Sequence, residues 1–241
     1  MILPAYNEEG NIVNTVSQIR KYRETQNLPV EVDYLVINDG SLDSTERVCR
    51  ENGIHCLSLV QNLGIGGAVQ TGYLYAAENG YDIAVQFDGD GQHDPNSLGT
   101  LIRPILDGEA DFTVGSRFLE ESSDFHSTFL RRVGIKYLSF LLQLAGGKAA
   151  GPRIRDVTSG YRAANRDVIS FLARNYPVDY PEPESLVNLR KNGFRIREVP
   201  VNMFERAEGK SSIGFLKSIY YMIKVTCAIL CAAIQGKEVR Y

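Results

Sequence analysis

Apolar runs and helical patterns alternate along the first half of the chain. Residues 32–38 form a nearly continuous apolar run, which is typical of a strand buried on both faces, and residues 54–60, 81–87 and 111–115 predict further strands. Helices are predicted between them, from about Glu8, from about Asp43 and over residues 64–79. This alternation predicts an α/β domain with a doubly wound, mostly parallel sheet flanked by helices.

The second half continues with helices predicted over residues 129–144 and 166–175 and up to about Gly193, and a strand over 195–201. Residues 213–234 are apolar and helical in pattern, but their longest uncharged stretch, 225–236, is shorter than the roughly 20 residues that span a bilayer. We therefore expect a main domain over residues 1–212. A C-terminal segment over 213–241 would contact either a membrane surface or another copy of the chain.

Three polar or glycine positions fall where predicted strands end. These are Asp39, Gly64 and Asp88, and ligands of doubly wound sheets bind at the carboxyl ends of the strands. The glycines from Gly64 onward do not complete a dinucleotide-binding fingerprint, because its third glycine would stand where Val69 does. The segment is then either a loop that enters a helix or a place where backbone N–H groups approach a ligand.

Two carboxylates, Asp88 and Asp90, follow the predicted strand 81–87 in a glycine-rich turn, and Gln92 comes two residues later. Oxygen ligands in such a cluster suit a hard divalent cation, Mg²⁺ or Mn²⁺. Two carboxylates at one strand end repel each other unless a cation or a proton lies between them. The turn therefore predicts a metal site.

Two other interpretations of this turn were weighed. An EF-hand loop needs glycine at its sixth position and glutamate at its twelfth, and the chain has His93 and Gly99 there. A helix-capping turn explains Asp94, which precedes Pro95, but not the paired carboxylates before it.

The composition fits an ordinary globular domain of 241 residues, with 44% apolar and 23% charged residues. A net charge of −3 gives no indication of nucleic-acid binding. The four cysteines show no zinc or disulfide spacing, and no apolar leader precedes Pro4, so we expect a cytoplasmic location.

Five motifs in order resemble family 2 of the glycosyltransferases, in particular the branch of dolichyl- and polyprenyl-phosphate sugar synthases. They lie at residues 4–8, 38–45, 88–93, 115–117 and 156–162. The resemblance implies a GT-A fold and an inverting, metal-dependent transfer of sugar from a UDP- or GDP-sugar. It also implies a polyprenyl-phosphate acceptor and a peripheral position at the inner face of the membrane.

The resemblance also implies roles for individual residues. The nucleoside pocket would consist of Pro4, Ala5, Tyr6, Glu8 and Asp39, with Gly64 close to the donor. The metal would be held by Asp88, Asp90 and Gln92. A mobile loop with Arg206, Lys210 and Ser211 would close over the diphosphate, unless it is simply a solvated loop.

Arg117 and Arg131 resemble the pair that grips the acceptor phosphate, a task that suits a planar guanidinium. A solvated helix face is the alternative for Arg131, and a turn-forming role is the alternative for Asp39. Glu184 resembles an acidic residue near the acceptor site, and it would act either as a general base or through the dipole at a helix N-terminus.

The chain departs from the family pattern at three places, one of which is the segment Glu182-Pro-Glu184, where relatives carry an acidic residue near the acceptor site. Ile65 stands where relatives often have a lysine, and the first strand looks nearly missing, which would weaken an edge of the sheet. Three other functions stay open: transfer to a saccharide hydroxyl, sugar nucleotidyl transfer, and a non-catalytic scaffold that binds nucleotide sugars. The chain lacks the glycine-rich basic loop after the first strand that is typical of nucleotidyltransferases.

Overall fold

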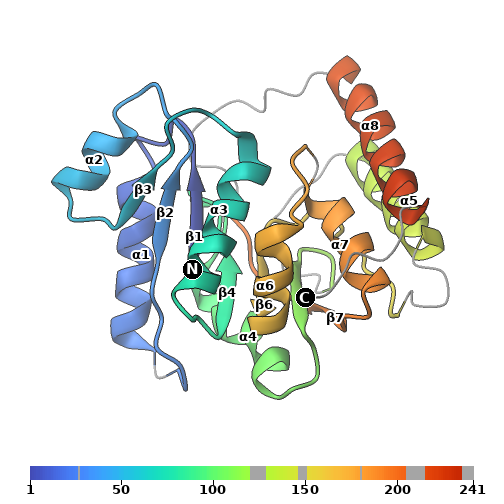
Figure 1. Cartoon of the computed structure of the whole chain (residues 1–241), viewed down its shortest axis with the longest axis horizontal. Helices are drawn as coiled ribbons and strands as arrows, with labels where there is room; N and C mark the ends of the chain where they lie inside the picture. The colour runs from blue at the N-terminus through green and yellow to red at the C-terminus, as the bar shows by residue number, and fades with distance from the viewer. Residues whose placement is uncertain (27, 120–128, 146–150, 180, 205–214, 235–241) are drawn as a thin grey trace.

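The computed structural model describes residues 1–26, 28–119, 129–145, 151–179, 181–204 and 215–234. In these residues, seven strands form one sheet in the order β3-β2-β1-β4-β6-β5-β7 (Figure 1). The strands are β1 Ile2–Ala5, β2 Leu35–Asn38, β3 Cys56–Ser58, β4 Ile83–Gln86, β5 Phe112–Ser116, β6 Arg162–Asn165 and β7 Ile196–Pro200. Only β6 runs antiparallel to its neighbours, so the predicted mostly parallel sheet is confirmed.

Helices cover both faces of the sheet. Those of the described residues are α1 Ile12–Thr25, α2 Thr45–Glu51, α3 Gly64–Glu78, the 3-10 turn η1 Pro95–Ser97, α4 Leu98–Leu106, α5 Phe129–Ala145, α6 Arg166–Arg174, α7 Pro181–Lys191 and α8 Phe215–Ile234. Buried side chains of α1, α2 and α4 form one core, and those of α3, α5, α6, α7 and α8 form the other. Neighbouring residues of β2 alternate between the two cores, as the pleat of a strand requires.

The first strand lies in the middle of the sheet, not at an edge. All four residues of β1 are buried, and Ile2 pairs with Leu35 on one side and with Gln86 on the other. The expected weakening of a sheet edge is therefore wrong, because β1 pairs on both sides.

The antiparallel strand β6 was not predicted. Its sequence, Arg-Ala-Ala-Asn, lacks the β-branched and aromatic residues that favour strands. Ala163 and Ala164 are fully buried between β4 and β5, where two helical layers cover the sheet. These small residues lie in a strand because they fit between two covered faces of the sheet, and not because alanine has a high strand propensity.

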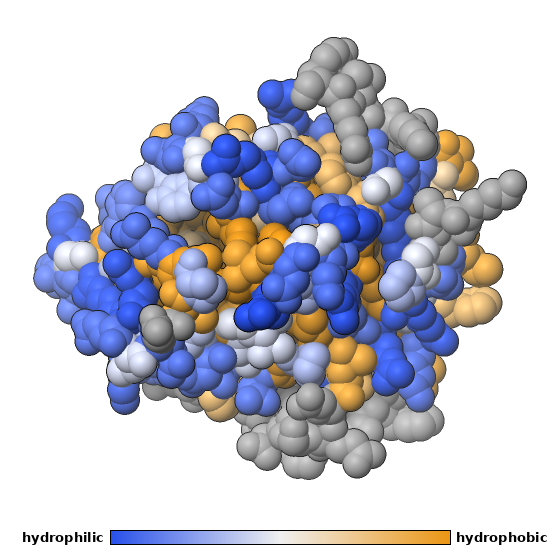
Figure 2. Space-filling model, turned by 90° about the horizontal axis from the view of Figure 1, so that it is seen from below, coloured by the Kyte–Doolittle hydropathy of each residue, from blue (hydrophilic) through white to orange (hydrophobic). Residues whose placement is uncertain are grey.

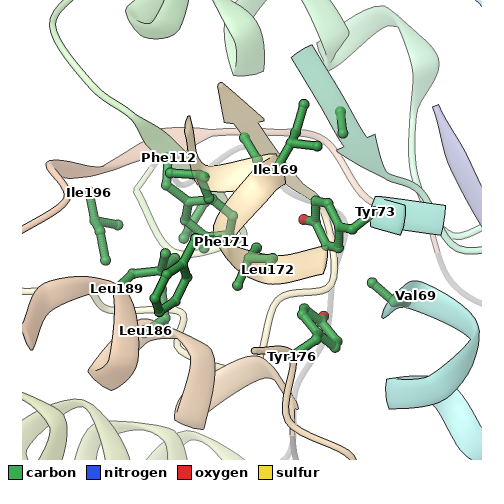
Figure 3. Packing of buried hydrophobic residues seen from close by; sticks show 14 of the residues in the cluster. Val69, Tyr73, Phe112, Ile169, Phe171, Leu172, Tyr176, Leu186, Leu189 and Ile196 are labelled. Atoms are coloured by element: carbon green, nitrogen blue, oxygen red, sulfur yellow. The ribbon is translucent and has the colours of Figure 1, made fainter. Parts of the chain in front are cut away.

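The larger core lies between the sheet and helices α3, α6 and α7. Figure 3 shows Tyr73 of α3 and Tyr176 pointing toward one another in this core, with ring centroids 5.5 Å apart. Helix α3 comes close to β1 because Gly72 has no side chain: a Cβ there would meet Ile2 Cγ2 at 2.2 Å. This contact fixes α3, and hence the loop before it, against the strand beside the candidate site.

Helices α5 and α8 lie side by side at the end of the molecule away from β3 (Figure 1). Gly134 permits this approach, since a Cβ there would be 3.3 Å from Met222 Sδ, and Val225 and Ile229 of α8 join the larger core. Cys227 and Cys231 of α8 are exposed. No described helix is long and apolar enough to cross a membrane.

Candidate active site

The parallel strands β1, β2 and β4 end at the same edge of the sheet, where most of the predicted site residues lie. Ala5 pairs with Asn38 at this edge, and the loop of Asp88 follows β4 directly. Gly89 packs against the end of β1, because a Cβ on it would be 3.0 Å from the carbonyl oxygen of Pro4. Residues far apart in sequence are thus collected at one edge.

The loops after β1 and β2 are held together by hydrogen bonds. The backbone N–H of Asn7 donates to Ser41 Oγ at 3.0 Å, and that of Glu8 donates to Thr45 Oγ1 at 2.9 Å. Asn7 has a φ of 57°, a left-handed conformation that asparagine tolerates better than most residues. The two loops therefore form one wall of the site.

The residues predicted for the nucleoside pocket differ in the solvent exposure of their side chains. Pro4 and Ala5 are buried, whereas 44% of Tyr6 is exposed. Glu8 is half-buried, and its carboxylate accepts a hydrogen bond from Asn11 Nδ2 at 2.8 Å. The Tyr6 ring is therefore accessible on this wall, while Pro4 and Ala5 are buried in the strand that precedes it.

Asp39 is buried and linked to the start of α3. Its carboxylate accepts the N–H of Leu63 at 2.7 Å. Burial raises the pKa of Asp39, and the N–H groups of Leu63 and Gly64 oppose this shift. The chain must bend sharply here: Gly40 has a φ of +62°, and a Cβ on it would be 2.7 Å from the nitrogen of Asn62. Two predicted residues, Asp39 and Gly64, are thus brought together.

His93 lies against Asp88 in two places. Its Nδ1 accepts the backbone N–H of Asp88 at 3.0 Å, and its Nε2 lies 3.5 Å from Asp88 Oδ2. Burial lowers the pKa of His93 to about 4, and the charge of Asp90 opposes this shift. A neutral His93 whose Nδ1 accepts a hydrogen bond carries its proton on Nε2, so that N–H faces the Asp88 carboxylate.

Aromatic rings hold this imidazole in place. Tyr161 stacks on His93 with the two centroids 4.7 Å apart, and Phe87 meets both rings edge-on. Gly160 lies against the carboxylate of Asp88, because a Cβ there would be 2.9 Å from Oδ2. The glycine of the 156–162 motif therefore lets its loop approach the acidic turn.

The other two predicted metal ligands sit in the same turn. Asp90 is 6% exposed, and its Oδ1 accepts the backbone N–H of Gln92 at 3.1 Å. The carbonyl oxygen of Gln92 accepts the N–H of Phe204 at 2.7 Å, and Asp94 caps the following turn through the N–H of Asn96. The predicted capping role of Asp94 is thus confirmed.

The acidic turn suits a divalent cation that is shared with a ligand. In the described residues, no three histidine, cysteine, aspartate or glutamate side chains form a ready-made metal centre. The predicted set is two carboxylates and the amide oxygen of Gln92, and 32% of the Asp88 side chain is exposed. Mg²⁺ is typically held by one or two carboxylates and completes its shell with water and substrate phosphates.

Arg117 is held by a carboxylate that the sequence analysis did not single out. Its Nε donates to Asp156 Oδ2 and its Nη2 to Oδ1, both at 2.7 Å, and Asp156 is fully buried. The Asp156 backbone N–H in turn donates to Glu198 Oε1 of β7 at 2.7 Å. Both Arg117 and Asp156 act electrostatically on His93, so this pair lies near the acidic turn.

Glu182 of α7 interacts electrostatically with Asp88 of the acidic turn, and the sequence analysis assigned it no role. Burial raises the pKa of Glu182, the positive charge of Arg162 lowers it, and the negative charge of Asp88 raises it further. Residues two apart on a helix do not share a face, so Glu182 and Glu184 of α7 point in different directions. The helical periodicity of residues 181–191 could therefore have indicated that only one of these two glutamates faces the site. The role of Glu184 stays a prediction.

Four other predicted residues are not placed by the structure. Arg206, Lys210 and Ser211 lie outside the described residues. Arg131 belongs to α5, but its side chain also lies outside them.

The described residues thus form a mixed sheet with an acidic turn after β4, beside the joined loops that follow β1 and β2. The family model described as "Glycosyl transferase family 2" matches residues 1–172. The chain belongs to glycosyltransferase family 2, and it is an enzyme that transfers sugars.

Curated relatives resemble the chain over most of its length. It is 31% identical to the UDP-N-acetylglucosamine–dolichyl-phosphate N-acetylglucosaminyltransferase of Methanococcus voltae, over 92% of this chain and 93% of that one. It is 28% identical to the polyprenol monophosphomannose synthase of Mycolicibacterium smegmatis, over 89% and 80% of the two chains.

The fold is that of a solved glycosyltransferase. A crystal structure of glucosyl-3-phosphoglycerate synthase from Mycobacterium tuberculosis, in complex with Mn²⁺, UDP and phosphoglyceric acid, matches with a TM-score of 0.69. The match has 21% sequence identity and covers 96% of this chain and 77% of that one. The predicted GT-A fold is thereby confirmed.

Proposed function

We propose that this enzyme transfers a sugar from a UDP- or GDP-sugar to a polyprenyl phosphate, with inversion at the anomeric carbon and with a divalent metal. The observation that carries the proposal is the 31% identity to a dolichyl-phosphate sugar transferase over almost the whole of both chains. An undecaprenyl-phosphate mannosyltransferase of Micrococcus luteus is 28% identical over 88% of this chain, which points to the same acceptor class.

The acidic turn is proposed to serve the departing nucleoside diphosphate. Asp88, Asp90 and Gln92 would hold Mg²⁺ or Mn²⁺, which supplies positive charge where negative charge grows on the leaving phosphate. His93 contributes by fixing Asp88: it accepts the backbone N–H at 3.0 Å and directs Nε2 toward the carboxylate. Asp39 and the exposed ring of Tyr6 would bind the nucleoside on the neighbouring wall.

For a phosphate acceptor, the main task of the protein is to orient the attacking oxygen. It is an anion near neutral pH, so it attacks without prior loss of a proton to a base. Arg117 would help to position it, together with Arg131. Because Asp156 already binds the Arg117 guanidinium at 2.7 Å, this arginine is rigidly oriented, as a positioning group should be.

The paired helices α5 and α8 are proposed to rest on the membrane that contains the acceptor, at its inner face. Eight of their apolar side chains are exposed: Val133, Tyr137, Phe140 and Leu144 of α5, and Tyr220, Ile223, Leu230 and Ile234 of α8. Figure 2 shows apolar surface at the right-hand end, where these helices lie in Figure 1. Contact with a second copy of the chain is the alternative use of this surface.

Transfer to a saccharide hydroxyl is the second candidate, and Glu182 is the observation that favours it. A hydroxyl must lose a proton as it attacks, and a carboxyl with a raised pKa near the acidic turn suits a general base.

The proposal is tested by incubating the purified chain and Mn²⁺ with radiolabelled UDP-N-acetylglucosamine, UDP-glucose or GDP-mannose and undecaprenyl phosphate in detergent. We expect label from one donor to enter the lipid fraction, and the same donor to raise the melting temperature. Transfer only to saccharides would favour the second candidate. Tight donor binding without any transfer would favour a scaffold.

A further inference from the structure

Arg162 is a completely buried cation that the proposed chemistry does not yet use. It is 1% exposed, and an arginine stays charged in a protein. Its three hydrogen bonds go to neutral oxygen atoms: Nε to Ser159 O at 2.6 Å, Nη1 to Ser185 Oγ at 2.9 Å and Nη2 to Val157 O at 3.2 Å. A buried charge is costly unless opposite charge lies nearby, so its position needs an explanation.

The guanidinium connects two segments that border the acidic turn. One is the loop of Val157 and Ser159, whose next residue, Gly160, abuts the carboxylate of Asp88. The other is the start of α7, where Ser185 receives the hydrogen bond from Arg162 and donates its own to the carbonyl oxygen of Glu182 at 3.2 Å. One side chain thus ties the segment that bears Glu182 to the loop that packs on Asp88.

The register of the sheet fixes the direction of this side chain. Arg162 is paired with Gln86 across β4 and β6, so the two side chains lie on one face of the sheet, and Gln86, the last residue of β4, comes two residues before Asp88. The Gln86 side chain accepts the hydroxyl of Tyr176 at 3.1 Å on that face, next to Tyr73 (Figure 3). Arg162 and the hydrogen-bonded pair of Gln86 and Tyr176 therefore lie on one buried face of the sheet.

We propose that Arg162 is a positioning residue for the transfer: through Ser185 and the 157–160 loop it holds Glu182 and Asp88 in a fixed relation to each other. The inference rests on the proposed function for its effect on turnover, but its structural part stands alone. Without the guanidinium, α7 and the acidic turn are expected to shift independently, and Asp88 loses the position from which it would hold the metal on the donor diphosphate.

Two variants test the inference. Arg162→Lys keeps the charge, but its three donors share one nitrogen atom and cannot reach the three acceptors that Nε, Nη1 and Nη2 bind separately, and Ser185→Ala removes only the hydroxyl bridge. Arg190→Lys is the matched control, because Arg190 is also buried and on α7 but bonds to Gln143 Oε1 and to the carbonyl oxygen of Pro152. Arg162→Met, which lacks the charge, separates charge from geometry.

We expect kcat to fall about 10-fold or more in Arg162→Lys and less in Ser185→Ala, as for other supporting residues around a site. The donor KM should change less than kcat does, because the loops after β1 and β2, which would bind the nucleoside, are not tied to Arg162. Arg190→Lys should lower the melting temperature similarly and leave kcat within about 2-fold. If Arg162→Lys and Ser185→Ala also keep kcat within about 2-fold, Arg162 is purely structural and the inference is wrong.

Amide hydrogen exchange provides a measurement that does not depend on turnover. Arg162→Lys and Ser185→Ala should speed exchange at the start of α7 and in the acidic turn together, whereas Arg190→Lys should not affect the turn. Unchanged exchange in the turn would overturn the inference even if the wild-type chain transferred no sugar. A lack of transfer by the wild type, with the expected exchange, would count against the proposed function alone.

Discussion

The carboxylate of Asp156 binds the guanidinium of Arg117 through two hydrogen bonds of 2.7 Å, and both groups are almost wholly buried. Removing one partner of a buried pair leaves an uncompensated charge. Asp156→Asn should therefore lower the free energy of unfolding by about 3 kcal/mol, measured by urea denaturation.

The exposed ion pair between Arg166 and Asp82 is the control for this change. Asp82→Asn should cost about 0.5 kcal/mol or less, since exposed pairs contribute little. An equally small effect of Asp156→Asn would mean that the buried pair does not hold Arg117 in place.

His93 should make the stability of the fold depend on pH. Its pKa is lowered by burial from 6.5 to about 4, so between these values the unfolded chain binds the proton that the folded chain excludes. The contribution is fully present above pH 6.5 and is lost as the pH falls through about 4, on the order of 3 kcal/mol.

His93→Gln should remove this part of the pH dependence. The measurement compares urea unfolding of both proteins at several pH values in the presence of a chelator. The wild type should lose more stability than the variant between pH 6.5 and 4. Parallel curves for the two proteins would show that His93 is not the buried neutral group that its contacts indicate.

The turnover of variants at the two glutamates of α7 distinguishes a phosphate acceptor from a hydroxyl acceptor. If the acceptor is a polyprenyl phosphate, Glu182→Gln and Glu184→Gln should each keep kcat within about 3-fold, because no base is required. If the acceptor is a hydroxyl, the variant that lacks the base should lose about 100-fold or more in kcat. Steady-state turnover measures both, and a large loss in either variant with undecaprenyl phosphate as acceptor would contradict the account.

Membrane contact through α5 and α8 predicts a further outcome. Phe140 and Ile223 are 56% and 59% exposed, so Phe140→Glu with Ile223→Glu should reduce binding to anionic lipid vesicles about 10-fold or more in a sedimentation assay. Val60→Glu is the control, since Val60 is fully exposed but lies after β3. If Val60→Glu weakens vesicle binding as much, or the double variant does not, the α5–α8 surface is not the membrane contact.

The parallel part of the fold could be predicted because its strands are apolar runs that end at glycine or acidic turns. Strand β6 could not, since Ala163 and Ala164 are chosen by burial between two neighbours and not by strand propensity. The expectation of a weak sheet edge at the first strand failed for a similar reason: strand order is a property of the whole sheet.

Some residues of the candidate site could likewise be predicted from the sequence, and others could not. The acidic turn stands in one short segment, so its spacing, together with the resemblance to a known family, was enough to single out Asp88 and Asp90. Asp156, the partner of Arg117, is 39 residues away, and Ser185, the partner of Arg162 on α7, is 23 residues away, so one sequence gives no signal for either pair. The choice between Glu182 and Glu184 depends on helical phase, which needs the start of α7.

The account depends most on a divalent cation bound by Asp88 and Asp90 together with the donor diphosphate. The most direct measurement is a Mn²⁺ titration by electron paramagnetic resonance, with UDP or GDP present, on the wild type, Asp88→Asn and Asp90→Asn. We predict one tightly bound Mn²⁺ in the wild type and an affinity at least about 10-fold weaker in each variant. Equal Mn²⁺ affinity in all three proteins would contradict the account.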